Sequence, residues 1–273
     1  MLKPILCAIA VLASGVPAQA QDVLPNLADI VEVKLIKGWP LANGDHVGAV
    51  TITLATGWKT YWRVAGETGL PPVFDWQGSG NLAAVEYHWP RPDIIETDGL
   101  QILGFSGQLT LPITFRPENA AKPLALVASL DLGVCREVCI PVHADLELDP
   151  DRQEGAQRLL IDMALADQPR TGADAGLTDA MCQLVKTDDG YHLSARFDLP
   201  MLEGRHEIVV FETATPDIWI TPSKSHRDGP SLFVETDLLD YANKAASAQP
   251  TGIRATIIGQ KIAVDVANCL MKS

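Results

Sequence analysis

Short runs in which apolar and polar residues alternate make up most of the chain between residues 23 and 148, and Gly, Pro, Asn and Asp separate these runs. Alternation of this kind is typical of strands that bury one face. The runs that predict strands are 28–36, 46–55, 82–90, 107–115 and 124–132. Their spacing predicts an all-β sandwich of the immunoglobulin-like kind.

The pattern becomes helical between residues 149 and 169, where Pro169 ends the run. The apolar residues at helical spacing are Leu159, Leu160, Met163 and Leu165. Because these residues repeat with the period of a helix rather than of a strand, the segment predicts one helix. We expect this helix to connect two halves of the chain.

Alternating runs resume after the turn at Thr171-Gly172. They cover residues 181–187, 191–199, 206–213, 231–238, 252–259 and 261–269. They predict a second β-sandwich, and the chain is too long for a typical single core. The predicted parts are a signal peptide (1–20), a first domain (21–149), a helical linker (150–172) and a second domain (173–273).

Residues 1–20 have the features of a secretory signal peptide. Lys3 precedes an apolar stretch from residue 5 to residue 16, and Ala18-Gln19-Ala20 forms a small-residue cleavage site. No later stretch reaches the roughly 18 to 20 apolar residues that a membrane span requires. We therefore expect a soluble, exported protein that begins near Gln21 and makes no stable membrane insertion.

The formal net charge is −13, from 21 Lys and Arg against 34 Asp and Glu. Such an acidic chain is a poor candidate for binding nucleic acid or an anionic membrane, because both are negatively charged. The six His are scattered without the HExxH spacing of zinc hydrolases, and no glycine-rich phosphate loop is present. We expect no cofactor and no resident metal ion.

Four cysteines remain once Cys7 leaves with the signal peptide. Cys182 lies in the first strand predicted for the second half, and Cys269 lies four residues from the C-terminus. A bridge between them would tie the first strand to the last and close a loop of nearly ninety residues, worth roughly 4 to 5 kcal/mol of stability. We predict this structural disulfide; two free thiols or a second redox pair are the alternatives.

The other two cysteines, Cys135 and Cys139, are separated by three residues in a strand-like run. One turn of helix would hold the side chains too far apart for a relaxed disulfide, whereas a hairpin with residues 136–138 as its turn makes them a facing pair. So small a ring adds little stability, because it removes little loop entropy. A redox-active pair, an inert cross-link and a metal site all stay open from the spacing.

Three stretches in order resemble the periplasmic N-terminal domain of the DsbD family of thiol:disulfide interchange proteins. They are GWKTYWRVAGETGLPPVFDW (57–76), YHWPRPDIIETDGLQILGFSGQLTLPITF (87–115) and VCREVCIP (134–141). The likeness is closer to the ScsB-type branch, which has a CxxxC pair followed by Ile-Pro. The rest of the chain resembles the second periplasmic domain of ScsB-type proteins more loosely, and we expect no membrane domain.

The resemblance implies an immunoglobulin-like first domain with thiol:disulfide oxidoreductase activity, acting as a protein-disulfide reductase. In it Cys139 would be the exchanging sulfur and Cys135 the resolving one. The implied partners are a thioredoxin-like or membrane-embedded thiol reductase, which donates electrons, and oxidised periplasmic proteins, which accept them. A cap over the pair would correspond to Asp98, Gly99, Leu100 and Gln101, with Phe105 as its aromatic residue.

Several nearby residues have plainer interpretations. Trp58, Tyr61 and Trp62 are expected to fill the core of a half-buried strand. Arg63 and Glu67 are expected to form an ordinary surface pair. His143 is expected on a strand surface, although it could tune the Cys139 thiolate or join a soft-metal site. The alternative function is therefore a non-enzymatic copper-handling or adaptor protein, in which Cys135 and Cys139 hold Cu(I).

Overall fold

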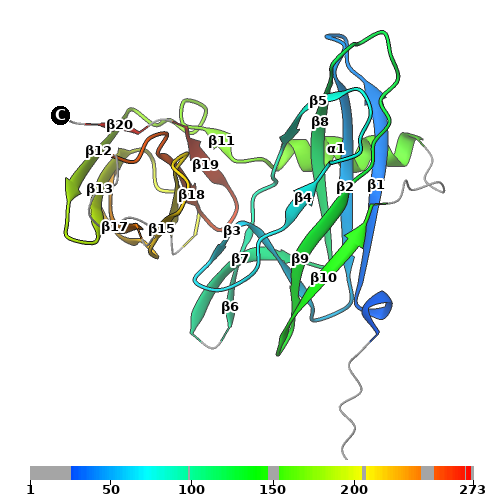
Figure 1. Ribbon diagram of the computed structural model, residues 1–273. Helices are drawn as coiled ribbons and strands as arrows, with labels where there is room; N and C mark the ends of the chain where they lie inside the picture. The colour runs from blue at the N-terminus through cyan, green and yellow to red at the C-terminus, as the bar shows by residue number, and fades with distance from the viewer. Residues whose placement is uncertain are drawn as a thin grey trace, which may run out of the picture.

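The computed structural model describes residues 26–97, 99–146, 154–204, 207–240, 249–267 and 269–271. The predicted signal peptide lies outside these residues. Within them the chain forms two β-sandwiches side by side and one α-helix (Figure 1). No helix in this described part is long and apolar enough to cross a membrane. The predicted all-β, immunoglobulin-like fold is confirmed.

The first sandwich consists of two antiparallel sheets that follow a short 3-10 helix, η1 (Leu27–Asp29). One sheet has the order β1 (Val31–Pro40), β2 (His46–Leu54), β8 (Gln108–Pro117) and β5 (Leu82–Tyr87). The other has the order β10 (Cys139–Asp145), β9 (Ser129–Cys135), β3 (Lys59–Gly66), β7 (Leu100–Ser106) and β6 (Asp93–Thr97), with β4 (Val73–Asp75) also paired to β9. Their inner faces enclose a core that includes Trp62, Leu111 and Phe115.

The second sandwich has the same two-sheet plan. One sheet has the order β11 (Arg170–Thr171), β19 (Ala263–Val266), β18 (Arg254–Ile258) and β14 (Ile208–Glu212). The other has the order β15 (Ile218–Ile220), β17 (Ser231–Asp240), β13 (Gly190–Asp198), β12 (Asp179–Lys186) and β20 (Leu270–Met271), with β16 (Lys224–Asp228) also paired to β17. Its core includes Leu193, Phe197 and Val264.

The predicted helix is present as α1 (Glu154–Ala166), but two of its four predicted apolar positions face solvent: Leu159 is 60% and Met163 62% exposed. Ile161 is fully buried instead, and it packs with Ile36 and other residues on the outer face of β1 and β2. The helix therefore covers a face of the first sandwich rather than only connecting the halves (Figure 1). Because β2 is covered on both faces, nearly all of it is buried.

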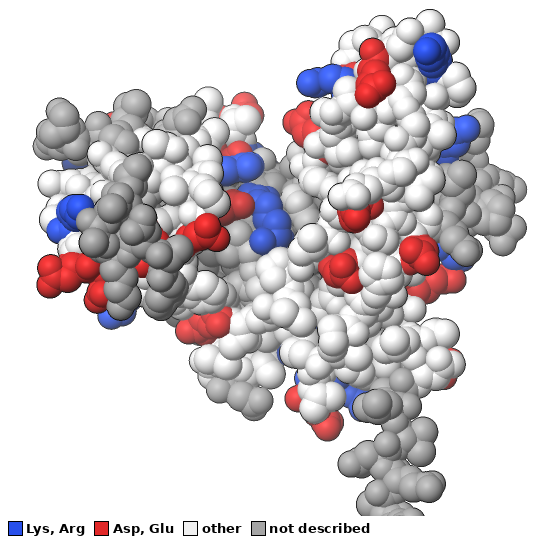
Figure 2. Space-filling model, viewed as in Figure 1, with Lys and Arg blue, Asp and Glu red and all other residues white. Residues whose placement is uncertain are grey.

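The two sandwiches contact each other directly. Ile258 and Ala263 of the second sandwich belong to the apolar cluster that fills the first, and Val210 packs against that cluster. Figure 2 shows basic side chains in the crevice between the two halves, with acidic side chains beside them. The domain boundaries predicted at residues 149 and 172 stay a prediction, and the first of them lies outside the described residues.

Candidate redox site

The cysteine pair closes the hairpin formed by β9 and β10. Cys135 and Cys139 face each other in the antiparallel register, and the Arg136 amide donates a hydrogen bond to the Val138 carbonyl oxygen across the turn at 3.2 Å. The predicted hairpin is therefore confirmed. In the structure a disulfide joins the two residues, with their Cα atoms 4.1 Å apart. The Arg136 guanidinium lies 5.2 Å from the ring centroid of Trp58.

The two sulfur-bearing residues differ sharply in exposure. Cys135 is only 2% exposed, whereas Cys139 is an exposed residue. The cause is their place in the sheet: β9 lies between β10 and β3, while β10 is an edge strand. A nucleophile from solvent or from another protein can therefore reach Cys139 and not Cys135.

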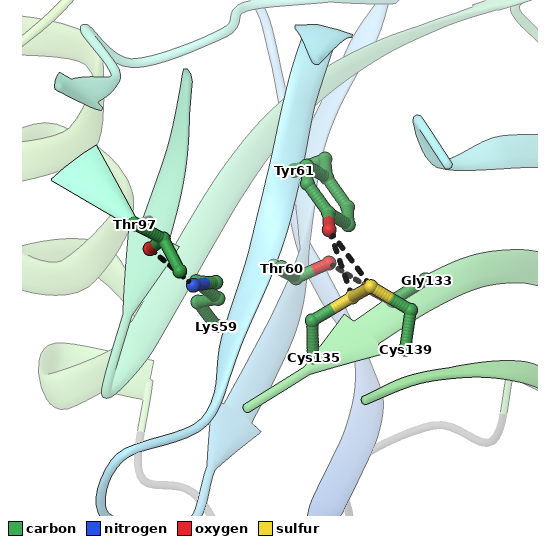
Figure 3. The surroundings of a disulfide bond; sticks show 7 residues. All are labelled: Lys59, Thr60, Tyr61, Thr97, Gly133, Cys135 and Cys139. Atoms are coloured by element: carbon green, nitrogen blue, oxygen red, sulfur yellow. Dashed lines mark hydrogen bonds between the residues drawn. A yellow bond between two sulfur atoms is a disulfide. The ribbon is translucent and has the colours of Figure 1, made fainter. Parts of the chain in front are cut away.

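Tyr61 contacts both sulfurs (Figure 3). Its hydroxyl group lies 2.8 Å from Cys135 Sγ and 3.2 Å from Cys139 Sγ, and the residue is 1% exposed. Burial raises the pKa of Tyr61 above its ordinary value of 10.0, because the charged phenolate would lose its hydration. The hydroxyl therefore stays protonated at neutral pH and can donate a hydrogen bond to a sulfur atom or a thiolate.

A short segment, residues 66–70, packs against Tyr61 and against β9 at Gly133; we call it the strap. Gly69 has a φ of +135°, and a Cβ atom placed on it would overlap the Tyr61 ring. The Leu70 carbonyl oxygen accepts a hydrogen bond from the amide of Gly133, two residues before Cys135, at 3.2 Å. Tyr61, Ala65 and Ile102 form a buried cluster with Cys135, and the strap packs on the tyrosine ring of that cluster.

A lysine lies on the strand next to the buried cysteine. Lys59 is the β3 partner of Cys135 in the register, and its buried ammonium group donates a hydrogen bond to Thr97 Oγ1 at 2.8 Å (Figure 3). Among the residues that the structure describes, no carboxylate forms an ion pair with Lys59. The ammonium group is thus directed toward Thr97 rather than toward either sulfur (Figure 3).

The predicted cap falls at the turn between β6 and β7, and its role stays a prediction. Ile102 of β7 packs in one buried cluster with Tyr61 and Cys135. Asp98 lies outside the described residues, Gly99 is in the tight turn from β6 to β7, and Leu100 already belongs to β7. Phe105 is buried in the core, where its ring stacks on Trp89 at 6.5 Å. Because successive residues of a strand point to opposite faces, Phe105 faces away from the side where Gly104 meets Tyr61.

The aromatic residues of β3 and its neighbours divide between core and site. Trp58 and Trp62 are core residues, as predicted, but Tyr61 points to the other face of the sheet and contacts the disulfide. The sequence reasoning therefore missed the role of Tyr61, although the alternation of Lys59 and Tyr61 with core residues was a usable signal. The predicted surface pair of Arg63 with Glu67 is wrong.

The actual partners of those two residues connect distant parts of the molecule. Arg63 forms an ion pair with Glu212 of the second sandwich at 2.9 Å. A carboxylate oxygen of Glu67 accepts a hydrogen bond from the Gln101 amide at 2.6 Å. Both contacts were invisible in the sequence because their partners lie in other strands.

His143 belongs to a separate surface cluster. Its Nδ1 lies 2.7 Å from Asp131 Oδ1, and hydrogen bonding to this carboxylate raises the pKa of the imidazole, with the Asp131 charge adding to the effect. It lies four positions along the extended strand from Cys139, a span of about 13 Å. Within the described residues no three His, Cys, Asp or Glu side chains are grouped so that they could hold a metal ion.

The second disulfide joins Cys182 of β12 to Cys269, just before β20, with Cα atoms 5.6 Å apart. Both residues are buried in the core of the second sandwich. The strands that they join run parallel, with Cys182 paired to Met271. This environment differs from that of the hairpin pair, because neither sulfur-bearing residue is open to an attacking thiolate.

Comparison with known proteins agrees with this geometry. The family model for the N-terminal region of thiol:disulfide interchange protein DsbD matches residues 31–150, which include the hairpin pair. The fold is similar to the crystal structure of the N-terminal periplasmic domain of ScsB from Proteus mirabilis, with a TM-score of 0.68 and 20% identity over 90% of this chain and 95% of that one. No curated protein matches the chain in sequence. Residues 31–150 are therefore similar to the N-terminal domains of thiol:disulfide interchange protein DsbD, and the likeness to the ScsB domain shows that the fold is shared.

Proposed function

We propose that this chain is a periplasmic thiol:disulfide oxidoreductase that passes electrons from a thioredoxin-like or membrane-embedded reductase to oxidised exported proteins. The observation that carries this proposal is the asymmetry of the hairpin disulfide, with an exposed Cys139 and a buried Cys135 that is hydrogen-bonded by Tyr61. The family match supports a role in thiol:disulfide interchange. The periplasmic setting is proposed because the similar ScsB structure is a periplasmic domain.

In the loading half of the cycle, a thiolate of the electron donor attacks Cys139 Sγ. The disulfide opens, and Cys135 leaves as a thiolate next to the Tyr61 hydroxyl and the Lys59 strand position. The donor's second thiolate then attacks its own sulfur in the mixed disulfide and releases Cys139. The donor becomes a disulfide, and two electrons and two protons have moved to the cysteine pair.

In the unloading half, the Cys139 thiolate attacks a disulfide of an oxidised protein and forms a mixed disulfide. Cys135 then attacks Cys139 Sγ, which restores the Cys135–Cys139 disulfide and releases the target with two thiols. Cys135 needs no access to the target for this step, because its reaction partner is the neighbouring sulfur. The buried residue is thus suited to resolving, and the exposed residue to exchange between proteins.

The test is to trap the mixed disulfide. Reduced Cys135→Ser is mixed with a thioredoxin-like protein whose second active-site cysteine is replaced by serine and whose first forms a mixed disulfide with a small thiol, which Cys139 displaces. The mixture is quenched with acid and analysed on a non-reducing gel. We expect an adduct that reductant dissolves, and no adduct with Cys139→Ser. Adducts from Cys139→Ser alone would exchange the two roles. No adduct from either variant, together with tight one-to-one Cu(I) binding by the reduced protein, would replace the proposal by the copper-handling alternative.

A further inference from the structure

Strand β3 links the disulfide to the second sandwich. Its first residues, Lys59 and Tyr61, lie beside the cysteine pair. β3 then pairs with β7 at Tyr61 opposite Gly104 and next at Gly66 opposite Ile102, so residues 62–65 bulge out of the ladder. Extra residues in one strand of a pair bend that strand and re-aim its side chains. Here the bulge carries Arg63 toward the second sandwich.

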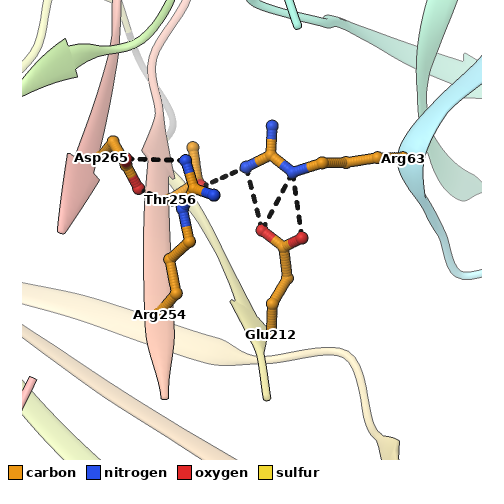
Figure 4. Close-up of polar contacts among 5 residues, drawn as sticks. All are labelled: Arg63, Glu212, Arg254, Thr256 and Asp265. Carbon is orange, nitrogen blue, oxygen red and sulfur yellow. Dashed lines mark hydrogen bonds and ion pairs between the residues drawn. The ribbon is translucent and has the colours of Figure 1, made fainter. Parts of the chain in front are cut away.

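Arg63 is tightly held there (Figure 4). Its Nε donates to the two carboxylate oxygens of Glu212 at 2.9 and 3.2 Å, and its Nη2 donates to Glu212 at 2.9 Å and to Thr256 Oγ1 at 3.2 Å. The guanidinium also lies 3.8 Å from the ring centroid of Trp62. A planar guanidinium that is both bidentate to a carboxylate and stacked on an indole has a fixed orientation.

The strands that carry the hydrogen-bond acceptors of Arg63 are themselves held by further contacts. Glu212 on β14 faces Arg254 on the neighbouring strand β18, and Arg254 binds both carboxylate oxygens of Asp265 on β19 at 2.6 and 2.7 Å (Figure 4). Ile258 of β18 is buried in the apolar cluster of the first sandwich. The anchor of the bulge is therefore part of a three-strand unit that is packed against the first domain's core.

The anchored bulge lies between Tyr61, which contacts Cys135, and the strap, which packs on Tyr61. Ala65 of the bulge packs in the same buried cluster as Cys135. Tyr61 precedes it directly, and the strap follows it directly. The strap begins at Gly66, whose φ is +87°, and the Glu67 amide donates a hydrogen bond to the Gln101 carbonyl oxygen at 3.1 Å. A movement of the bulge therefore displaces Tyr61 on one side of it and the first residue of the strap on the other.

We propose that Arg63 is a positioning residue through which the second sandwich keeps Cys135 covered. By binding Glu212, it holds the β3 bulge, and the bulge holds Tyr61 against the buried cysteine and the strap against Tyr61. The inference deepens the proposed function, since it gives the second sandwich a role in setting which cysteine reacts. Because the test measures how readily a small reagent reaches Cys135, it needs no partner protein.

The experiment measures alkylation of the two cysteines after mild reduction that leaves Cys182–Cys269 closed. Iodoacetamide is used at about pH 9.5, where thiols are largely ionised, so the rates report access. Each thiolate displaces iodide and forms a thioether, which peptide mass spectrometry quantifies. For Arg63→Gln and for Glu212→Gln we expect the labelling of Cys135 relative to Cys139 to rise at least about threefold. The double variant should match either single variant, because all three lack the same interaction.

The matched control is Arg227→Gln, which breaks an even more buried Arg–Glu pair within the second sandwich, where Arg227 Nε lies 2.6 Å from Glu207. It should lower the melting temperature and leave the labelling ratio unchanged. The inference is overturned if Arg227→Gln raises the ratio as much as Arg63→Gln, or if folded Glu212→Gln has the wild-type ratio. Failure to exchange with thioredoxin-like proteins would instead count against the proposed function alone.

Discussion

At the residue scale, the most informative side chain is Tyr61, because a single hydroxyl serves both sulfurs. Its closer contact is with Cys135, at 2.8 Å, and its further one with Cys139, at 3.2 Å. A hydrogen bond donated to a thiolate favours the charged form. Tyr61 is thus placed to stabilise the leaving thiolate in the first step of exchange and the attacking thiolate in the second.

We predict that Tyr61→Phe keeps the fold and slows the chemistry. The ring still fills its site, but alkylation of both reduced cysteines near pH 7 should fall roughly tenfold, because a hydrogen bond to a charged group is lost. The pH of half-maximal alkylation should rise, and more for Cys135 than for Cys139. The raised pKa of Tyr61 means that the wild-type hydroxyl still donates throughout this range. An unchanged pH profile with an unchanged melting temperature would show that the contact has no chemical role.

At the element scale, the strap and the hairpin act together, because the strap's backbone bonds directly to β9. Gly69 is the residue that permits this contact: its φ is +135°, and any Cβ would overlap the Tyr61 ring. A side chain at such a φ costs of the order of 1–3 kcal/mol even without a clash. The clash also affects the redox site, since it displaces the Tyr61 ring that covers Cys135.

Gly69→Ala is therefore expected to lower the free energy of unfolding and also to expose Cys135 to alkylation. Gly107→Ala is the matched control, since Gly107 has a φ of +72° with open space around the position of a Cβ. Gly107→Ala should also lower the free energy of unfolding, because alanine is strained at a positive φ, but it should leave Cys135 protected from alkylation. Equal Cys135 labelling in the two variants, measured by peptide mass spectrometry after mild reduction, would contradict the role of the strap.

At the scale of the whole molecule, the two disulfides are predicted to differ in both lability and contribution to stability. Mild reductant should free two thiols rather than four, because Cys139 is exposed while Cys182 and Cys269 are buried in a core. Mass spectrometry of alkylated peptides should locate the label on the hairpin pair. Labelling of Cys182 and Cys269 first would reverse the assignment of roles.

Replacing each pair by serine should separate the two contributions in denaturant unfolding. Loss of the bridge between Cys182 and Cys269, 87 residues apart, should cost about 4 to 5 kcal/mol, because it frees a long loop in the unfolded chain. Loss of the pair four residues apart should cost about 2 kcal/mol by the same relation. Equal losses of stability from the two double variants would contradict the division into a structural and an exchanging disulfide.

Features that depend on neighbours along the chain could be predicted from the sequence. Alternation identified most of the strands, and helical spacing identified α1. The spacing of Cys135 and Cys139 was enough to predict a facing pair in a hairpin, because three residues between them leave few other geometries. The ordered motifs likewise indicated the DsbD N-terminal family, whose model matches residues 31–150.

Features that depend on contacts between distant residues needed the tertiary structure. Alternation could not say that Tyr61 reaches a sulfur 74 residues away, nor that Arg63 binds Glu212, 149 residues away. The apolar residues of α1 did not reveal which of them would face β1 and β2. The sequence by itself thus determined the strands, the hairpin and the cysteines that can react. Only the packing of sheets, strap and second sandwich decided which sulfur is exposed, because burial depends on all the segments that come together in space.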